Sequence, residues 1–253
     1  MNLLLVGGAG QVGTVIAPYL AAHHDLRVLD VSAPRDSAMA FVQGSVTDPG
    51  AVREALAGVD GFIWLAMRDG QGGMRRDQDV ATILNNYELN TTGLHLFLFL
   101  AQEAEVKRGV YSSSMSVHFR GRDWYPAEEL VPFDTPSVYG LTKGMGEHIC
   151  QYFARWFDMN LIALRITGPR ARAEYLAERR SPRPLQDGSF VHVTDEADLA
   201  RAYLAAIDAT AVGHGRFDAV FIAGDEAGRE HNLSKAERLL GWTPQSHRLL
   251  NEE

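Results

Sequence analysis

LLLVGGAGQVG, at residues 3–13, is the stretch that decides the fold. Its first four residues are apolar, which is typical of a strand buried on both faces of a sheet. Glycines follow at once, in the spacing Gly-x-x-Gly-x-x-Gly, where such a strand turns into a helix. Bare backbone lets a pyrophosphate approach the amides at the positive end of that helix. The stretch predicts a dinucleotide-binding loop, with a structural tight turn as the alternative. The candidate contacts are Gly7, Gly10, Gln11, Val12 and Gly13.

Short apolar runs alternate with helical patterns along most of the chain. This alternation implies a parallel sheet covered on both faces, and right-handed crossovers make it an α/β doubly wound parallel sheet, the Rossmann fold. The expected strands are 3–6, 26–30, 41–42, 62–66, 109–112, 161–166 and 217–222. The expected helices are 12–22, 49–57, 86–104, 138–156, one that opens at Thr194 or Asp195, and 235–240 with Ser234 as its cap.

The pattern changes after Arg165. Residues 168–189 combine prolines and arginines with little periodicity, so we expect mostly loop there. We expect a dinucleotide-binding domain with the catalytic residues at 1–167. Residues 168–253 are expected to form a small C-terminal substrate-side lobe, partly interleaved with that domain, over the carboxyl ends of the main strands.

Composition excludes several classes of protein. The 253 residues, 46% of them hydrophobic, can bury the core of one domain, or of one domain and a small lobe. A net charge of −8 argues against nucleic-acid binding, which needs a basic face. Cys150 is the only cysteine, so a disulfide within the chain is impossible and a reducing, cytoplasmic location is expected. The apolar start reaches glycine too soon for a signal peptide or a membrane span.

Asp30 ends the second expected strand, about 20 residues past the glycine loop. A carboxylate there can accept hydrogen bonds from both hydroxyls of the adenosine ribose and repels a 2′-phosphate. NAD is therefore favoured over NADP as cofactor. A solvated Asp at a strand end is the alternative, and Arg27 and Arg35 nearby keep the preference open.

Tyr139 and Lys143 are four residues apart, so on a helix they share one face. A lysine ammonium, together with the positive nicotinamide ring, stabilises a phenolate and brings the tyrosine pKa of about 10 toward the working range of a base. Ser114, or its neighbour Ser113, ends the preceding strand and can bond the reacting oxygen opposite Tyr139. Tyr-x-x-x-Lys alone is often structural. The combination predicts oxidation or reduction at a carbinol or carbonyl carbon.

At this point the chain resembles the extended short-chain dehydrogenase/reductase superfamily, the NAD-dependent sugar epimerases and dehydratases, nearly from end to end. The shared motifs are Gly7-x-x-Gly10-x-x-Gly13, Asp30, Leu65-Ala66, Asn90-x-x-Gly93, Ser112-Ser113-Ser114, Tyr139-x-x-x-Lys143, Phe190-Val-His-Val193 and Leu240-Gly-Trp-x-Pro244. The resemblance implies that NAD is the cofactor, that Ser114 and Tyr139 act on the substrate, and that Lys143 supports both. It further implies a cofactor groove that includes Leu65, Ala66, Asn90 and Ile166.

Some positions depart from the family pattern. Ser45 stands where members usually carry an Asp that contacts adenine, so that contact is weaker or different here. Val6 replaces a small hydroxyl residue, and His118 replaces a common tyrosine. Nucleotide-sugar epimerases are usually longer, whereas only about 25 residues separate Arg165 from His192 here. Among family members the chain looks most like the short uronate dehydrogenases, which oxidise a free uronic acid at C1 with NAD.

Arginines are concentrated in segments expected around the active site. A planar guanidinium suits a carboxylate or phosphate, so the sequence favours an anionic sugar derivative, with scattered surface arginines as the alternative. The candidate substrate contacts are Ser113, Arg75, Arg120 and Arg170. The nine histidines show no metal-ligand spacing, so no metal site is expected, and His192 is interpreted as structural.

Three functions remain open on the sequence. The first is an NAD-dependent oxidoreductase acting on a sugar or sugar acid, with Tyr139 as general base. The second is a nucleotide-sugar epimerase or dehydratase that recycles NAD in each turnover. The third is a non-catalytic NAD-binding regulator. Because the expected helix 86–104 is apolar nearly all round, we also expect a homodimer through that helix and helix 138–156.

Overall fold

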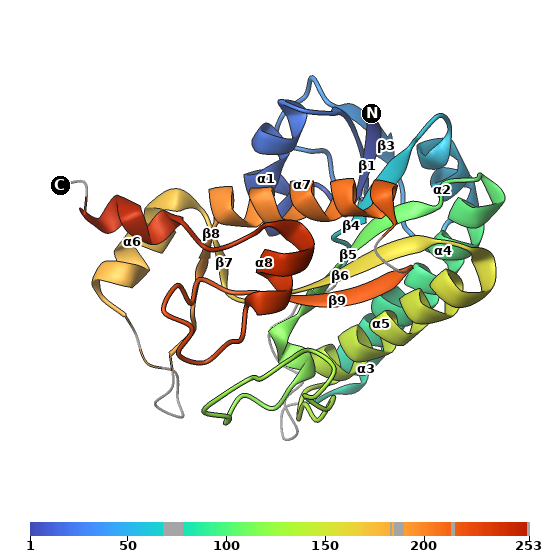
Figure 1. Ribbon diagram of the computed structural model, residues 1–253. Coiled ribbons are helices and arrows are strands. Elements are labelled where there is room, and N and C mark those ends of the chain that lie inside the picture. Colours follow the sequence, from blue (N-terminus) through green and yellow to red (C-terminus); the bar gives the residue numbers. More distant parts are fainter. Residues whose placement is uncertain (68–77, 183, 185–189, 214–215, 252–253) are drawn as a thin grey trace.

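The computed structural model describes residues 1–67, 78–182, 184, 190–213 and 216–251. Its centre is a seven-stranded sheet in the order β3-β2-β1-β4-β5-β6-β9, with every neighbouring pair parallel (Figure 1). The strands are β1 (Asn2–Val6), β2 (Asp25–Asp30), β3 (Ala40–Gln43), β4 (Gly61–Trp64), β5 (Arg108–Ser114), β6 (Asn160–Ile166) and β9 (Phe217–Ile222). The predicted doubly wound α/β fold is confirmed.

Helices cover both faces of this sheet, as the near-continuous apolar strands require. One face carries α1 (Gln11–Ala21) and α7 (Glu196–Val212), and the other carries α2 (Pro49–Leu56), α4 (Leu94–Glu103) and α5 (Val138–Phe157). Successive residues of β1 alternate between the two cores: Leu4 packs with the α2–α4–α5 face, and Leu3 with the α1–α7 face.

The expected helix 86–104 is divided into three pieces. It comprises α3 (Val80–Tyr87), a π-helical turn at Glu88–Gly93, and α4. The hydroxyl of Thr91, in the middle of the turn, donates to the Tyr87 carbonyl. A side chain that bonds the carbonyl four residues back competes with the regular ladder, and π-turns are frequent at functional sites.

Two expectations about the C-terminal region were wrong. Residues 168–189 were expected to be mostly loop, but Arg172–Arg180 form α6, which buries only Tyr175 and therefore lacks a clear apolar stripe. Ser234 was expected to cap α8 (Ser234–Leu240), but it is the first helical residue, and Leu233 precedes the helix without a side-chain cap. The predicted end is confirmed, since Gly241 has φ +60°.

Residues after 167 divide between two parts of the molecule. β9 is the last strand of the main sheet, α7 covers one face of that sheet, and α8 packs against both β9 and α7. In contrast, α6 and the short pair β7 (Pro169–Arg170) and β8 (Thr194–Asp195) lie beyond the carboxyl edge of the sheet (Figure 1). A domain boundary at 167/168 stays a prediction. Among the described residues, no helix is both long and apolar enough to cross a membrane.

Candidate active site

Most predicted cofactor and catalytic residues lie where parallel strands end. The glycine loop follows β1, Asp30 ends β2, Ser45 follows β3, and Leu65-Ala66 follow β4. Ser114 ends β5 and Ile166 ends β6. Because carboxyl ends of parallel strands meet at one edge, this sheet gathers these residues into the crevice where doubly wound folds bind ligands.

Two glycines of the loop have no room for a side chain. Gly7 adopts φ +79°, and a Cβ there would lie 2.5 Å from the backbone of Ala66. A Cβ at Gly13 would lie 2.2 Å from the Gly8 carbonyl oxygen, which allows α1 to start directly against the loop. The loop is thus held close to the segment after β4, which the sequence predicts as the far wall of the cofactor groove.

The start of α1 is suited to an anion. Gly10 is its N-cap in extended conformation, no side chain caps the helix, and its first turn carries no acidic residue. Amides at such an end lack intrahelical acceptors and favour a phosphate. Gln11 is exposed and donates to the Pro169 carbonyl at 3.4 Å, while Val12 is half-buried against the α1–α7 core. This cradle fits the pyrophosphate of NAD.

Asp30 lies directly beside the glycine loop. Its Oδ2 accepts from the Ala9 amide at 3.0 Å and its Oδ1 from the Ser32 amide at 3.0 Å, so the carboxylate is fixed at the end of β2. Each oxygen has further acceptor capacity for a ribose hydroxyl. The Ser45 hydroxyl lies 2.8 Å from that of Thr47, in the position where the family pattern has an Asp.

Asn90 lies in the π-helical turn and is fully buried. Its amide nitrogen donates to Thr142 on α5 at 3.0 Å and to Asn86 at 3.2 Å, while its Oδ1 has no partner among the described residues. Asn90 therefore joins the turn to α5 one residue before Lys143, and its free oxygen marks a polar site under the crevice.

The predicted catalytic residues come together at the start of α5. The Ser114 hydroxyl accepts from the Ser116 amide at 3.1 Å and lies within hydrogen-bonding reach of Tyr139. The half-buried Tyr139 donates to Met67 Sδ at 3.7 Å. Close approach depends on Gly140, where a Cβ would lie 2.0 Å from the Ser116 carbonyl oxygen. In the sequence, Gly140 is visible as the first residue of the run Gly140 to Glu147 around Lys143, but its role in this contact is not.

Burial sets the protonation of the Tyr139–Lys143 pair. Burial raises the pKa of Tyr139 to about 12, although a hydrogen bond with the Ser114 hydroxyl partly opposes this rise. Burial also lowers the pKa of Lys143 to about 7. Lys143 Nζ donates to the Ser112 carbonyl at 2.8 Å and lies 5.9 Å from the centre of the Tyr139 ring. The expectation that the tyrosine pKa falls is thus not met by the protein alone, because desolvation disfavours the phenolate.

Beneath the site lies a buried ion pair that the sequence reading did not single out. Glu147, one helical turn after Lys143, accepts two bonds from Arg165 at 2.9 and 2.7 Å. The Ser113 hydroxyl donates to the same carboxylate at 2.5 Å and is buried, so it faces this pair rather than the crevice. Of the two candidate serines, Ser113 is therefore engaged by the ion pair, whereas the Ser114 hydroxyl is not.

Most of the described arginines that the sequence places near the site are paired with carboxylates. Arg170 binds Glu178 at 2.8 Å, and Arg179 and Arg122 each bind a carboxylate as well. Arg120 is exposed, with no ion pair seen among the described residues, and Arg75 lies outside them. The local excess of arginines therefore overstates the charge that is free to bind an anion.

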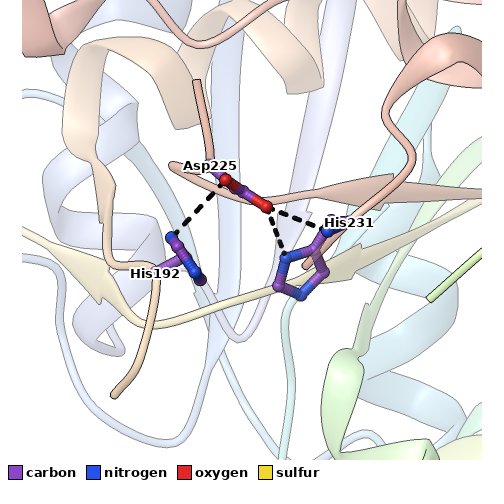
Figure 2. Close-up of side chains that lie close together, drawn as sticks. All are labelled: His192, Asp225 and His231. Carbon is purple, nitrogen blue, oxygen red and sulfur yellow. Dashed lines mark hydrogen bonds and ion pairs between the residues drawn. The ribbon is translucent and has the colours of Figure 1, made fainter. Parts of the chain in front are cut away.

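A pocket of about 640 Å³ opens beside α6 and the segments that follow β9 and precede β8. Its wall includes His192, Val193 and Asp225, and it carries four carboxylates against two arginines, Arg179 and Arg229. His192 and His231 lie on either side of Asp225 (Figure 2). Their wide separation in sequence concealed this group.

Known proteins share the sequence and the fold. The chain is 24% identical to the NAD-dependent glucose-6-phosphate dehydrogenase of Haloferax volcanii, over 97% of this chain and 93% of that one. It is 28% identical to the uronate dehydrogenase of Pseudomonas syringae pv. tomato, over 65% of this chain and 58% of that one. The chain spans less than half the length of some other curated relatives.

A solved UDP-glucose 4-epimerase from Brucella ovis, in complex with NAD, has the same fold with a TM-score of 0.77 and 21% identity, over 96% of this chain and 93% of that one. The profile of the NAD dependent epimerase/dehydratase family matches residues 3–223, which include the glycine loop, Ser114, Tyr139 and Lys143. The chain therefore belongs to the NAD-dependent epimerase/dehydratase family, an enzyme family of the extended short-chain dehydrogenase type whose cofactor is NAD.

Proposed function

We propose that this protein is a dehydrogenase that oxidises a carbinol of a small sugar or sugar acid and releases NADH. The observation that carries the proposal is the meeting of Ser114, Tyr139 and Lys143 at the mouth of the cofactor crevice. The match along almost the whole chain to a relative named as an NAD-dependent sugar-phosphate dehydrogenase supports it.

In this mechanism the chain's own residues move the proton. Tyr139 Oη takes the proton of the substrate hydroxyl while Ser114 Oγ donates a hydrogen bond to the same oxygen. NAD, held by the glycine loop and Asp30, supplies the hydride acceptor and a positive ring. Lys143, once protonated, stabilises the tyrosine phenolate.

The charges required can be estimated from the distance between the two side chains. If the 5.9 Å from Lys143 Nζ to the centre of the Tyr139 ring is taken as the separation of the two charges, a lysine cation stabilises the phenolate by roughly 3 kcal/mol at an effective dielectric constant of about 20. That energy raises the phenolate population by about a hundredfold. With a tyrosine pKa of about 12, one cation is too little at neutral pH, so a second positive charge in the crevice is needed.

An epimerase that recycles NAD is the second candidate. A UDP-glucose 4-epimerase of Corynebacterium glutamicum is 24% identical over 97% of this chain, which favours it. The experiment that separates the two offers free aldoses, uronic acids, sugar phosphates and sugar nucleotides with NAD, and measures both NADH and inverted sugar. Net NADH from a free sugar supports the dehydrogenase. Inversion of a sugar nucleotide without net NADH supports the epimerase, and inertness toward all of them supports a regulator.

An anionic substrate is the finer part of the proposal. Arg229 is exposed on the pocket wall, with no ion pair seen among the described residues, and offers a guanidinium to a carboxylate. A charged hydrogen bond of about 1.5–3 kcal/mol predicts that Arg229→Met raises KM for a uronic acid by about ten- to a hundredfold. The neutral parent aldose should be unaffected. Equal effects on both substrates would remove the charge argument.

The choice of NAD over NADP is proposed to rest on Asp30. Titrating both cofactors by calorimetry against the parent protein and Asp30→Ala tests this. The variant should bind NAD more weakly and lose its discrimination against NADP.

A further inference from the structure

Three side chains of the kinds that ligate metals meet on the wall of the 640 Å³ pocket. His192 precedes β8, Asp225 follows β9, and His231 lies six residues later in the chain. Figure 2 shows the Asp225 carboxylate between the two imidazole rings. One ligand atom from each residue lies within 4.8 Å of the other two.

The spacing of these atoms is close to that of ligands around one small cation. Asp225 Oδ1 lies 3.8 Å from His192 Nδ1, and Asp225 Oδ2 lies 3.3 Å from His231 Nδ1. Ligands in a tetrahedron around Zn²⁺, each about 2.1 Å from the ion, are about 3.4 Å apart. The separation of 3.8 Å between His192 and Asp225 is too long for a hydrogen bond but within the range of an ion pair, whereas the 3.3 Å contact between His231 and Asp225 is a hydrogen bond.

The backbone and a neighbouring ring hold these ligands in place. Asp225 Oδ2 accepts from the amides of Glu230 and His231 at 2.8 and 2.9 Å. Among the described residues, its Oδ1 accepts a hydrogen bond from the Arg229 amide alone, at 3.0 Å, and keeps a lone pair on the His192 side. The buried His231 ring stacks on Tyr125, with 5.1 Å between centroids and 11° between planes. Ligands oriented in this way need little rearrangement to bind an ion.

Charge around the pocket favours a cation. Glu230 Oε1 lies 3.4 Å from His192 Nε2, so the ring stands between two carboxylates. Two further carboxylates of the pocket wall, Glu178 and Glu226, are paired with Arg170 and Arg179, so Asp225 and Glu230 stand against one arginine, Arg229. This leaves an excess of negative charge beside the histidines.

We propose that His192, Asp225 and His231 bind a divalent transition-metal ion such as Zn²⁺. The partial exposure of the His192 side chain, 23%, leaves a coordination position toward the pocket for water or for an oxygen of the substrate. Three protein ligands with one open position is the arrangement of a reactive zinc site rather than of a closed structural one.

The test is a calorimetric titration of the chelator-treated full chain with Zn²⁺, with Co²⁺ absorbance as a report on the coordination geometry. We expect one ion per chain. His192→Ala should weaken its binding by at least about a hundredfold, since loss of an outer partner alone costs 10–100-fold. This variant should fold, because no hydrogen bond of the His192 ring is seen among the described residues. His231→Phe, which can keep the stacking on Tyr125, should weaken binding similarly.

The matched control is His23→Ala, which removes an exposed histidine from the adjacent pair His23-His24. It should leave the affinity unchanged. If both pocket variants keep the zinc affinity of the parent chain, or if His23→Ala loses it instead, the ion binds elsewhere and the proposal is overturned. The absence of zinc binding to the parent chain would overturn it as well. The readout does not depend on dehydrogenase activity, so it stands apart from the proposed function.

Discussion

Tyr139 is the residue on which the proposed chemistry depends. Tyr139→Phe removes the proton-transferring oxygen and keeps the ring, so we expect kcat to fall by about 10²–10⁴-fold with NAD affinity nearly unchanged. Steady-state NADH formation measures kcat, and a calorimetric titration measures the affinity for NAD. Tyr152→Phe, an exposed tyrosine on the same helix, is the control and should retain its rate. A Tyr139→Phe enzyme with most of its activity would require another base.

Lys143 links activity to stability through pH. Its pKa is about 7 in the folded protein, against an ordinary 10.5, because burial disfavours the ammonium. Between these two values the unfolded chain binds the extra proton, so the free energy of unfolding rises with pH from about 7 toward 10.5. Urea midpoints at pH 7 and pH 9 should therefore rise more for the parent protein than for Lys143→Met. The same shift in both proteins would mean that the lysine is charged when folded.

At the scale of elements, the position of the start of α5 depends on Gly140, which has no side chain. Gly140→Ala places a methyl group where the Ser116 carbonyl lies, so the helix must move away from Ser114, and we expect a large loss of kcat in a folded protein. At Gly144, on the same helix, the nearest atoms to an added methyl group belong to the Phe133 side chain, which can move, so Gly144→Ala should cost far less. Circular dichroism and NADH formation measure the two effects. Equal rates for the two variants would contradict the argument.

The elements that the sequence predicted well carry strong local signals. Short apolar runs that alternate with helical patterns located the strands of the sheet, and a long helical pattern located α5. The π-turn around Asn90 and the short helix α6 lack such signals. The ion pairs Arg165–Glu147 and Arg179–Glu226, and the His192–Asp225–His231 group, join residues far apart in the chain. Counting charges along one segment therefore overestimates how many arginines are free to bind an anion. It also does not reveal that the two histidines lie beside Asp225.

At the scale of the whole molecule, α4 and α5 present an apolar surface to solvent. Phe99, Tyr152 and Trp156 are 40%, 45% and 66% exposed, and Leu96 lines a hollow of about 490 Å³ between the two helices. We propose that a second copy of the chain covers this surface through a two-fold axis, as helix faces of this kind commonly do in homodimers. Leu96→Glu should then shift the mass measured by light scattering to that of a monomer.

The matched control for this prediction is Val212→Glu, at the end of α7 and 85% exposed. It should leave the assembly unchanged. A parent protein that is monomeric at micromolar concentration would exclude the dimer.

The N-terminal turn of α7 has a consequence for how the molecule unfolds. Asp195 accepts hydrogen bonds from Arg172 at 2.6 Å and from the Ser246 hydroxyl at 2.8 Å, and Asp198 accepts one from the Ser246 amide at 2.9 Å. These bonds attach α6 and the C-terminal residues to α7, whose other side packs in the core against the sheet. Neither region can melt without exposing that helix. Thermal denaturation should therefore show one cooperative transition, with calorimetric and van't Hoff enthalpies in agreement. Asp198→Ala should lower that single melting temperature rather than split it in two.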